Sequence, residues 1–194
     1  MQLFYILILF SIGLLSQEYE TQNYKSIGTL DGAEVRFYPQ AIKVKTVAAE
    51  GNNQNFSKLF NYISKGNASK TKIAMTTPVY METTSAGNQM EFVLPAKYLS
   101  LKVPQPIGSD VTVYKSSAGY FIALEFGGYN NAYKTVKYRD QLEKIMDKHG
   151  IQKCSSLKVL GYDSPYTLFN RRNEVLYEVA KESLPNALKK AFNN

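Results

Sequence analysis

The chain has 194 residues, 44% of them hydrophobic, and carries a formal net charge of +7. This length and apolar content fit one compact globular domain, or at most two very small ones. The only cysteine, Cys154, excludes an intrachain disulfide, so the domain must be held together by its core. A basic surface can attract anionic lipid, nucleic acid or a carboxylate-bearing ligand, and charge alone does not choose among them.

Residues 1–17 contain no charged side chain and are almost continuously apolar. The run is too short to span a bilayer comfortably and lies at the N-terminus, so it predicts a secretory signal peptide. The protein is then expected to be secreted or in the secretory pathway, with no stable membrane span after cleavage. An uncleaved anchor is the alternative, because the segment has no Lys or Arg and no clean cleavage site. Two N-x-S/T sequons predict glycosylation at Asn55 and Asn67.

The first half of the chain predicts one helix among four strands, after a polar lead-in at residues 18–32. Alternating or enriched apolar residues with proline punctuation predict strands at 33–39, 41–50, 72–82 and 90–95. The helix is expected at residues 55–66, where four apolar residues recur at helical spacing and a glycine ends the run. Those four residues are Phe56, Leu59, Phe60 and Ile63.

The second half predicts a hairpin, a longer helix and two further strands. These elements are a hairpin at 111–126 that turns at 116–119, a helix at about 131–149, and strands at 156–165 and 173–181. Gly127-Gly128 gives the backbone freedom to turn from strand to helix. His149 and Gly150 fit the C-terminal end of the helix. A single domain would then occupy residues 33–182, with 183–194 as a C-terminal tail.

The two halves share one order of elements: strand, helix, strand, strand. The first set is 41–50, 55–66, 72–80 and 90–94, and the second is 120–127, 131–149, 157–163 and 174–180. Two β-α-β-β units of this kind can pair their edges into one sheet. The pattern therefore predicts an α+β fold in which two β-α-β-β-like halves form one twisted, barrel-like antiparallel sheet with two main helices.

No residue pattern argues for an enzyme or a metal site. The sole histidine, His149, and Cys154 cannot complete a zinc site, for which four ligands are normal. No glycine-rich phosphate loop with its lysine is present. Neither Glu125 nor Asp163 has a sequence partner that marks it for acid-base chemistry. Fifteen tyrosines and ten phenylalanines suggest an apolar or stacking ligand surface, although most should belong to the core.

Six segments in a fixed order resemble the SOUL haem-binding protein family. They are EVRFYP, FNYISKGN, KIAMTTPV, FVLP, FGGY and GYDSPYTLFNRRNEV, and they span residues 33 to 180. The resemblance implies a twisted, barrel-like sheet flanked by two helices. It also implies non-covalent binding of haem or another tetrapyrrole without a catalytic reaction. The ligand would lie against the first helix, at residues 53–63, and the loop before the last strand, at 164–170.

Site residues are carried over from the family position by position. Phe56 and Phe60 match apolar positions of the helix on the haem side, and Leu168 lies in the facing loop. The helix has one apolar stripe, which must also pack on the sheet. If its four apolar residues all face the core, little apolar surface remains for a porphyrin.

The positions that meet haem propionates in the family carry no charge in this chain. They fall at Asn53, Asn61 and Thr167. Lys58 and Lys65 could substitute, because a lysine stem is long enough to bring its ammonium to a propionate. The iron ligand is open: Met75, a tyrosine, or no protein ligand at all.

The resemblance favours a non-catalytic tetrapyrrole carrier or scavenger, with haem, porphyrin or another apolar small molecule as partner and no nucleic acid. The alternative is an interaction or other small-ligand module on the same fold that has lost haem. Within the last family segment, Arg172 and Glu174 share a strand face and predict a charge pair. Arg171 points the other way and is expected to anchor the loop at 164–170.

Overall fold

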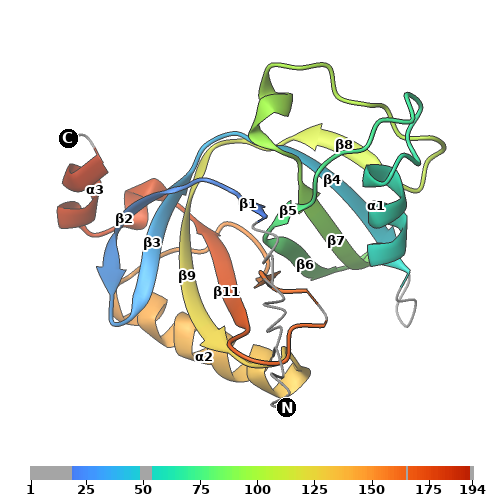
Figure 1. Cartoon of the computed structure of the whole chain (residues 1–194). Coiled ribbons are helices and arrows are strands. Elements are labelled where there is room, and N and C mark those ends of the chain that lie inside the picture. The colour runs from blue at the N-terminus through green and yellow to red at the C-terminus, as the bar shows by residue number, and fades with distance from the viewer. Residues whose placement is uncertain (1–18, 49–53, 165, 193–194) are drawn as a thin grey trace, which may run out of the picture.

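The computed structural model describes residues 19–48, 54–164 and 166–192, so the predicted signal peptide lies outside the described residues (Figure 1). The strands are β1 (Glu20–Thr21), β2 (Lys25–Leu30), β3 (Ala33–Tyr38), β4 (Ile42–Ala48), β5 (Thr76–Thr77), β6 (Val79–Thr84), β7 (Gly87–Val93), β8 (Thr112–Lys115), β9 (Gly119–Gly127), β10 (Lys158–Gly161) and β11 (Arg172–Val179). The helices are α1 (Asn55–Ile63), α2 (Ala132–Lys148) and α3 (Asn186–Phe192), with 3-10 turns η1 (Ala96–Leu99) and η2 (Lys181–Ser183). None of these helices is long and apolar enough to cross a membrane.

One large sheet organises the fold. Its strand order is β2-β3-β9-β11-β10-β6-β7-β4-β8, and all neighbours in it are antiparallel. The predicted α+β class and the twisted antiparallel sheet are confirmed. The sheet does not close into a barrel, because β2 and β8 remain as its two edges. A separate parallel pair, β1 and β5, lies beside it.

The two predicted halves are present and related by topology. The first is β4-α1-β6-β7 and the second is β9-α2-β10-β11. Within the sheet their strands take the equivalent orders β4-β7-β6 and β9-β11-β10, and the halves meet where β6 pairs with β10. Each half thus places its last strand in the middle, as expected for a repeated β-α-β-β unit.

The predicted hairpin at 111–126 is wrong. β8 pairs with β4, whereas β9 pairs with β3 and β11, so the two expected partners lie far apart in the sheet. Local turn residues at 116–119 suggested a hairpin, but β8 and β9 each pair with strands that are distant in the sequence. The lead-in at 18–32, for which the sequence indicated no strand, contributes β1 and β2. A register shift between Ser26 and Gly28 interrupts the alternation in β2 that would have revealed it.

Both faces of the sheet are covered, but they differ in chemistry. On one face, α1 packs on β4 and β7 and α2 packs on β9 and β11, over two apolar clusters. Val175, Tyr177 and Val179 of β11 belong to this face. The other face carries Leu176 together with buried polar side chains, including Arg36, Lys43, Glu91 and Glu174. These polar side chains belong to the surroundings of the two sites described below.

The ends of α2 follow the residues expected for them. The side chain of Asn131 accepts a hydrogen bond from the Lys134 backbone N–H at 2.9 Å and caps the first turn. His149 is the C-terminal cap, and Gly150 follows with a φ of 64°, which favours glycine. His149 therefore lies at the helix end, as predicted. Its Nε2 atom lies 2.9 Å from Asp31.

Candidate functional site

The apolar stripe of α1 divides into a buried part and an exposed part. Leu59 and Ile63 are buried against the sheet, whereas Phe56 and Phe60 are 37% and 48% exposed. The two exposed rings stack on each other, with centroids 5.8 Å apart and planes 13° apart. Phe56 also meets the edge of Phe92, at 5.5 Å between centroids. Packing on the sheet therefore leaves a stacked aromatic pair available to a ligand.

A cleft of about 540 Å³ lies beside this aromatic pair. One wall consists of Phe56, Phe60, Met75 and Val79, and the other is formed by residues 161–164 and Tyr166. Tyr19 and Thr77 complete the lining. The volume is within the range of small-molecule and cofactor sites, which are mostly apolar with a few polar groups. The structure thus brings together α1 and the loop before β11, the two segments that the sequence pointed to; we call this the α1 cleft.

The loop before β11 presents apolar side chains to solvent. Tyr166, Leu168 and Phe169 are 90%, 68% and 80% exposed. Of these three, Tyr166 lines the α1 cleft, whereas Leu168, the residue predicted from the family, does not. Arg171 Nη1 donates to the backbone carbonyls of Ser164 at 3.0 Å and Thr167 at 2.9 Å. The predicted anchoring role of Arg171 is confirmed.

None of the described residues considered as propionate partners lines the α1 cleft. Lys58 forms an ion pair with Asp110 at 3.3 Å, and Asn61 and Lys65 are exposed outside the cleft. Asn53 lies outside the described residues. Among the described lining residues the only charged one is Asp163. The cleft therefore offers apolar and aromatic contacts but no cation.

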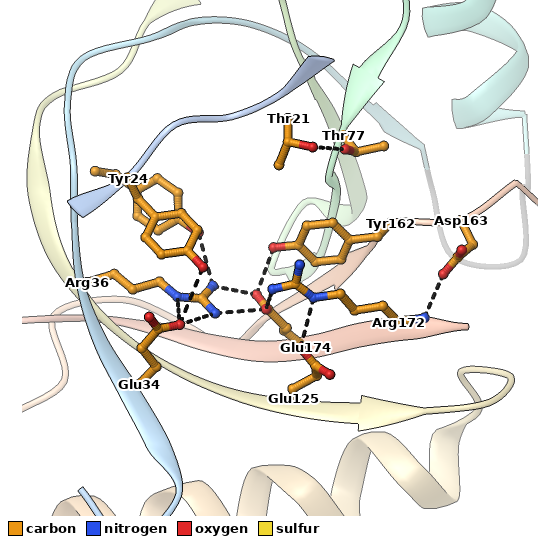
Figure 2. A network of polar contacts seen from close by, with 11 residues as sticks. Thr21, Tyr24, Glu34, Arg36, Thr77, Glu125, Tyr162, Asp163, Arg172 and Glu174 are labelled. Atoms are coloured by element: carbon orange, nitrogen blue, oxygen red, sulfur yellow. Dashed lines mark hydrogen bonds and ion pairs between the residues drawn. The ribbon is translucent and has the colours of Figure 1, made fainter. Parts of the chain in front are cut away.

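A buried carboxylate, Glu174, lies at the centre of a polar network beside the cleft (Figure 2). Arg36 donates to both of its oxygens, at 2.6 and 2.9 Å, Arg172 donates at 2.7 Å, and the Tyr162 hydroxyl donates at 2.9 Å. Burial alone would raise the pKa of Glu174, but the bonds and charges of the two arginines outweigh it and hold that pKa below the usual value. Glu174 is therefore ionised, and both of its carboxylate oxygens accept hydrogen bonds.

This network holds one wall of the α1 cleft. The Arg172 guanidinium lies 4.2 Å from the centre of the Tyr162 ring, and the Arg172 backbone N–H donates to Asp163 at 2.6 Å (Figure 2). Burial and the Glu174 charge raise the pKa of Tyr162, so its hydroxyl stays a neutral donor. The predicted Arg172–Glu174 pair is confirmed, and Arg172 also pairs with Glu125 at 2.8 Å. The alternation of β11 indicated the pair but not Arg36, which comes from β3.

The two predicted glycosylation sites are buried in this fold. Asn55 is 5% exposed and its Nδ2 donates to the Asn88 carbonyl at 2.7 Å. Asn67 is fully buried, and its Nδ2 donates to the carbonyls of Tyr62 and Thr71 at 2.9 and 2.7 Å. A glycan on either nitrogen would displace these bonds, so the packing argues against glycosylation of the folded chain.

The fold and the cleft define an α+β protein of two β-α-β-β halves with an apolar surface cleft. The sequence model of the family described as SOUL heme-binding protein matches residues 19–178, which is most of the chain. The chain belongs to this family, as the ordered segments indicated.

Related proteins of known name support the same placement. The chain is similar to heme-binding protein 2 of Homo sapiens, with 30% identity over 178 residues, covering 82% of this chain and 86% of that protein. It is 24% identical over 136 residues to heme-binding protein 1 of Xenopus tropicalis, covering 66% and 70% of the two chains.

Solved structures share the fold at much lower identity. The EcmrR C-terminal domain has a TM-score of 0.53 at 12% identity, with 81% of this chain and 98% of that chain covered. A hydrolase from Listeria innocua has a TM-score of 0.54 at 11% identity, with 79% and 94% covered. At such identities the likeness shows the fold alone.

Proposed function

We propose that the chain binds haem or another planar tetrapyrrole non-covalently in the α1 cleft and acts as a carrier or scavenger without catalysis. Membership of a heme-binding family supports the ligand class. The observation that carries the proposal is the stacked, half-exposed Phe56–Phe60 pair opposite residues 161–164 and Tyr166. Aromatic faces of this kind give a flat apolar ligand both buried area and stacking contacts.

The residues of the α1 cleft fit the ring of haem better than its carboxylates. Phe56, Phe60 and Val79 would hold the apolar macrocycle, while the absence of Lys and Arg among the described lining residues directs the propionates to solvent. Haem would supply the chemistry of its iron, and Met75, which lines the cleft, would offer its thioether as a ligand to that iron. Tyr162 would donate its hydroxyl to Glu174 and stay neutral beside the ligand.

A haemin titration of the chain, followed in the Soret band, tests this proposal. We expect a saturable spectral change, and Phe60→Asp should weaken it at least about tenfold, because a carboxylate would face the apolar ring. Tyr133→Asp is the matched control, since Tyr133 is 75% exposed on α2, away from the cleft. Absence of saturable binding by the folded chain, or equal affinities of the two variants, would refute the proposal.

The second candidate is another small-ligand or interaction role on the same fold. The observation that favours it is the absence of a cation for the propionates among the described residues of the cleft. Under this alternative, haemin would not bind, and protein from the native source would carry a different molecule that Phe60→Asp releases. Mass spectrometry of an organic extract of native and variant protein distinguishes the two candidates.

Secretion and removal of residues 1–17 also remain a proposal, supported by the apolar N-terminal run. Expression of the whole chain in secreting eukaryotic cells provides the test. We expect the medium to contain a chain that begins near residue 18, as read by N-terminal sequencing. Retention of all the protein inside the cells with an intact N-terminus would contradict it.

A further inference from the structure

A second cavity, of about 370 Å³, lies on the sheet face opposite to the helices. It shares no lining residue with the α1 cleft. Tyr38 of β3 and Phe121 of β9 line one side, and Lys43 of β4 and Tyr114 of β8 line the other. Because these strands lie towards opposite edges of the sheet, its curvature must fold the two sides around the cavity. We call this space the sheet cavity.

Aromatic rings form much of the wall of the sheet cavity. Tyr38 and Phe121 meet edge to face, with centroids 5.3 Å apart. Tyr80 is buried at the base and donates its hydroxyl to Gln22 at 2.6 Å, while Tyr114 comes from the edge strand. Rings arranged in this way are suited to a flat aromatic ligand.

A buried lysine with spare hydrogen-bonding capacity borders the same cavity. Lys43 is 7% exposed, and its ammonium lies 3.3 Å from Glu91 and 3.5 Å from the centre of the Tyr80 ring. The ammonium has three N–H donors, and Glu91 is its only oxygen acceptor among the described residues. Burial lowers the pKa of Lys43, and the Glu91 charge opposes that shift only in part. An acceptor in the cavity would complete the bonding of this ammonium.

The Glu91 carboxylate, in contrast to the Lys43 ammonium, has several hydrogen-bond partners within the protein. It accepts from Lys43 and, at 2.9 Å each, from the side chains of Gln89 and Tyr114. Two further lysines line the cavity, but Lys158 forms an ion pair with Glu82, and Lys115 is matched by one further lining carboxylate, Glu178. The charges around the cavity therefore balance, and it is the unused donor of the Lys43 ammonium that favours a ligand with an anionic oxygen acceptor.

We propose that the sheet cavity binds a small aromatic carboxylate, with its ring among the tyrosines and its carboxylate on Lys43. Such a ligand would supply both the stacking surface and the oxygen acceptor that the cavity calls for. Binding here does not depend on tetrapyrrole binding in the α1 cleft, because the two sites have no lining residue in common.

Binding of 2-naphthoate, measured by its fluorescence and by equilibrium dialysis, tests the proposal. We expect saturable binding that neutral 2-naphthamide does not match and that cyclohexanecarboxylate, which lacks an aromatic ring, does not compete away. The double variant Lys43→Met/Glu91→Gln removes the charge pair as a unit, which buried pairs tolerate better than loss of one partner. It should bind naphthoate about tenfold to a hundredfold more weakly.

Ser117→Trp provides a second variant that leaves the buried pair intact. Ser117 is exposed and lines the cavity, so a large ring there should block entry and abolish binding without disturbing the core. Phe60→Asp should leave naphthoate binding unchanged, which separates this proposal from the one for the α1 cleft. No saturable binding by the folded chain, or unchanged binding by the folded double variant or by Ser117→Trp, would overturn the proposal.

Discussion

At the scale of single residues, Glu174 is a buried carboxylate that accepts four hydrogen bonds from three side chains. It is fully buried and accepts hydrogen bonds from Arg36, Arg172 and Tyr162. Glu174→Gln would remove the buried carboxylate that two guanidinium groups share and leave each with one partner that is more exposed, Glu34 or Glu125, so we expect a loss of about 3–5 kcal/mol in unfolding free energy. Urea denaturation measures this, with Glu125→Gln as control. Glu125 also pairs with Arg172 but is mostly exposed, so its replacement should cost less than about 1 kcal/mol.

The same carboxyl group should make the stability of the folded chain depend on pH in the acid range. Because the pKa of Glu174 is lower in the folded chain than the ordinary 4.5, its stabilisation is fully present above about pH 4.5. It is lost as the pH falls through the lower folded value, where the buried carboxylate takes up its proton. Melting temperatures between pH 2 and pH 7 should therefore fall more steeply in acid for the natural chain than for Glu174→Gln. Melting temperatures that fall in parallel for the two proteins as the pH decreases would contradict this assignment.

Asn67, in the second N-x-S/T sequon, is expected to stabilise the fold through its side-chain hydrogen bonds. Its side chain donates to the carbonyls of Tyr62 and Thr71, and its Oδ1 accepts from Ser69 and the Thr71 backbone. Asn67→Ala would leave buried backbone carbonyls without a donor, which costs about 1–3 kcal/mol each. We expect a large drop in the denaturation midpoint, and Ala68→Ser, at an exposed neighbour, should leave it unchanged. A neutral effect of Asn67→Ala would show that the loop does not need these bonds.

At the scale of elements, the loop before β11 should depend on Arg171. Removing its two hydrogen bonds to the Ser164 and Thr167 carbonyls in Arg171→Ala should loosen the loop while costing only about 1–2 kcal/mol of global stability. Chymotrypsin should then cut faster after Tyr166 and Phe169, which are already exposed. Arg139→Ala is the control, because within the described part of the chain the Arg139 guanidinium donates its hydrogen bonds to its neighbour Asp140 alone. Equal cleavage rates in both variants would argue against the anchoring role.

Elements with a strong periodic signal were predictable, and pairing between distant strands was not. The spacing of Phe56, Leu59, Phe60 and Ile63 indicated α1, and Asn131 with Gly150 bounds α2 as expected. The turn predicted at 116–119 suggested a hairpin, because local residues do not indicate that β8 pairs with β4. Which of the four apolar residues of α1 stay exposed also depends on the sheet beneath them. The periodicity of the sequence identifies the apolar face of a helix. Tertiary packing decides which residues of that face are buried in the core and which remain available to a ligand.

At the scale of the whole molecule, the order of the predicted elements indicated the two repeated halves. It did not indicate that the polar face of the sheet is covered. Alternation in β11 placed Glu174 opposite Val175, which in an antiparallel sheet usually means solvent. Residues 20–24 cross that face, where Gln22 bonds to Tyr80 and Tyr24 packs on Tyr38, and the curved sheet encloses the rest. Polar residues there become a buried network and a cavity. Sequence patterns separate apolar from polar faces but do not show which polar face is covered.

The location of the ligand is tested most directly by hydrogen exchange of the haemin-loaded chain, read by mass spectrometry. We predict slowed exchange in α1 and in residues 161–170, with no change in β8 or at residues 116–118 beside the sheet cavity. The reason is that a tetrapyrrole against Phe56 and Phe60 would cover the first two segments and leave the opposite face of the sheet free. Unchanged exchange in α1 at haemin saturation, or protection confined to the sheet cavity, would contradict a tetrapyrrole site at the α1 cleft.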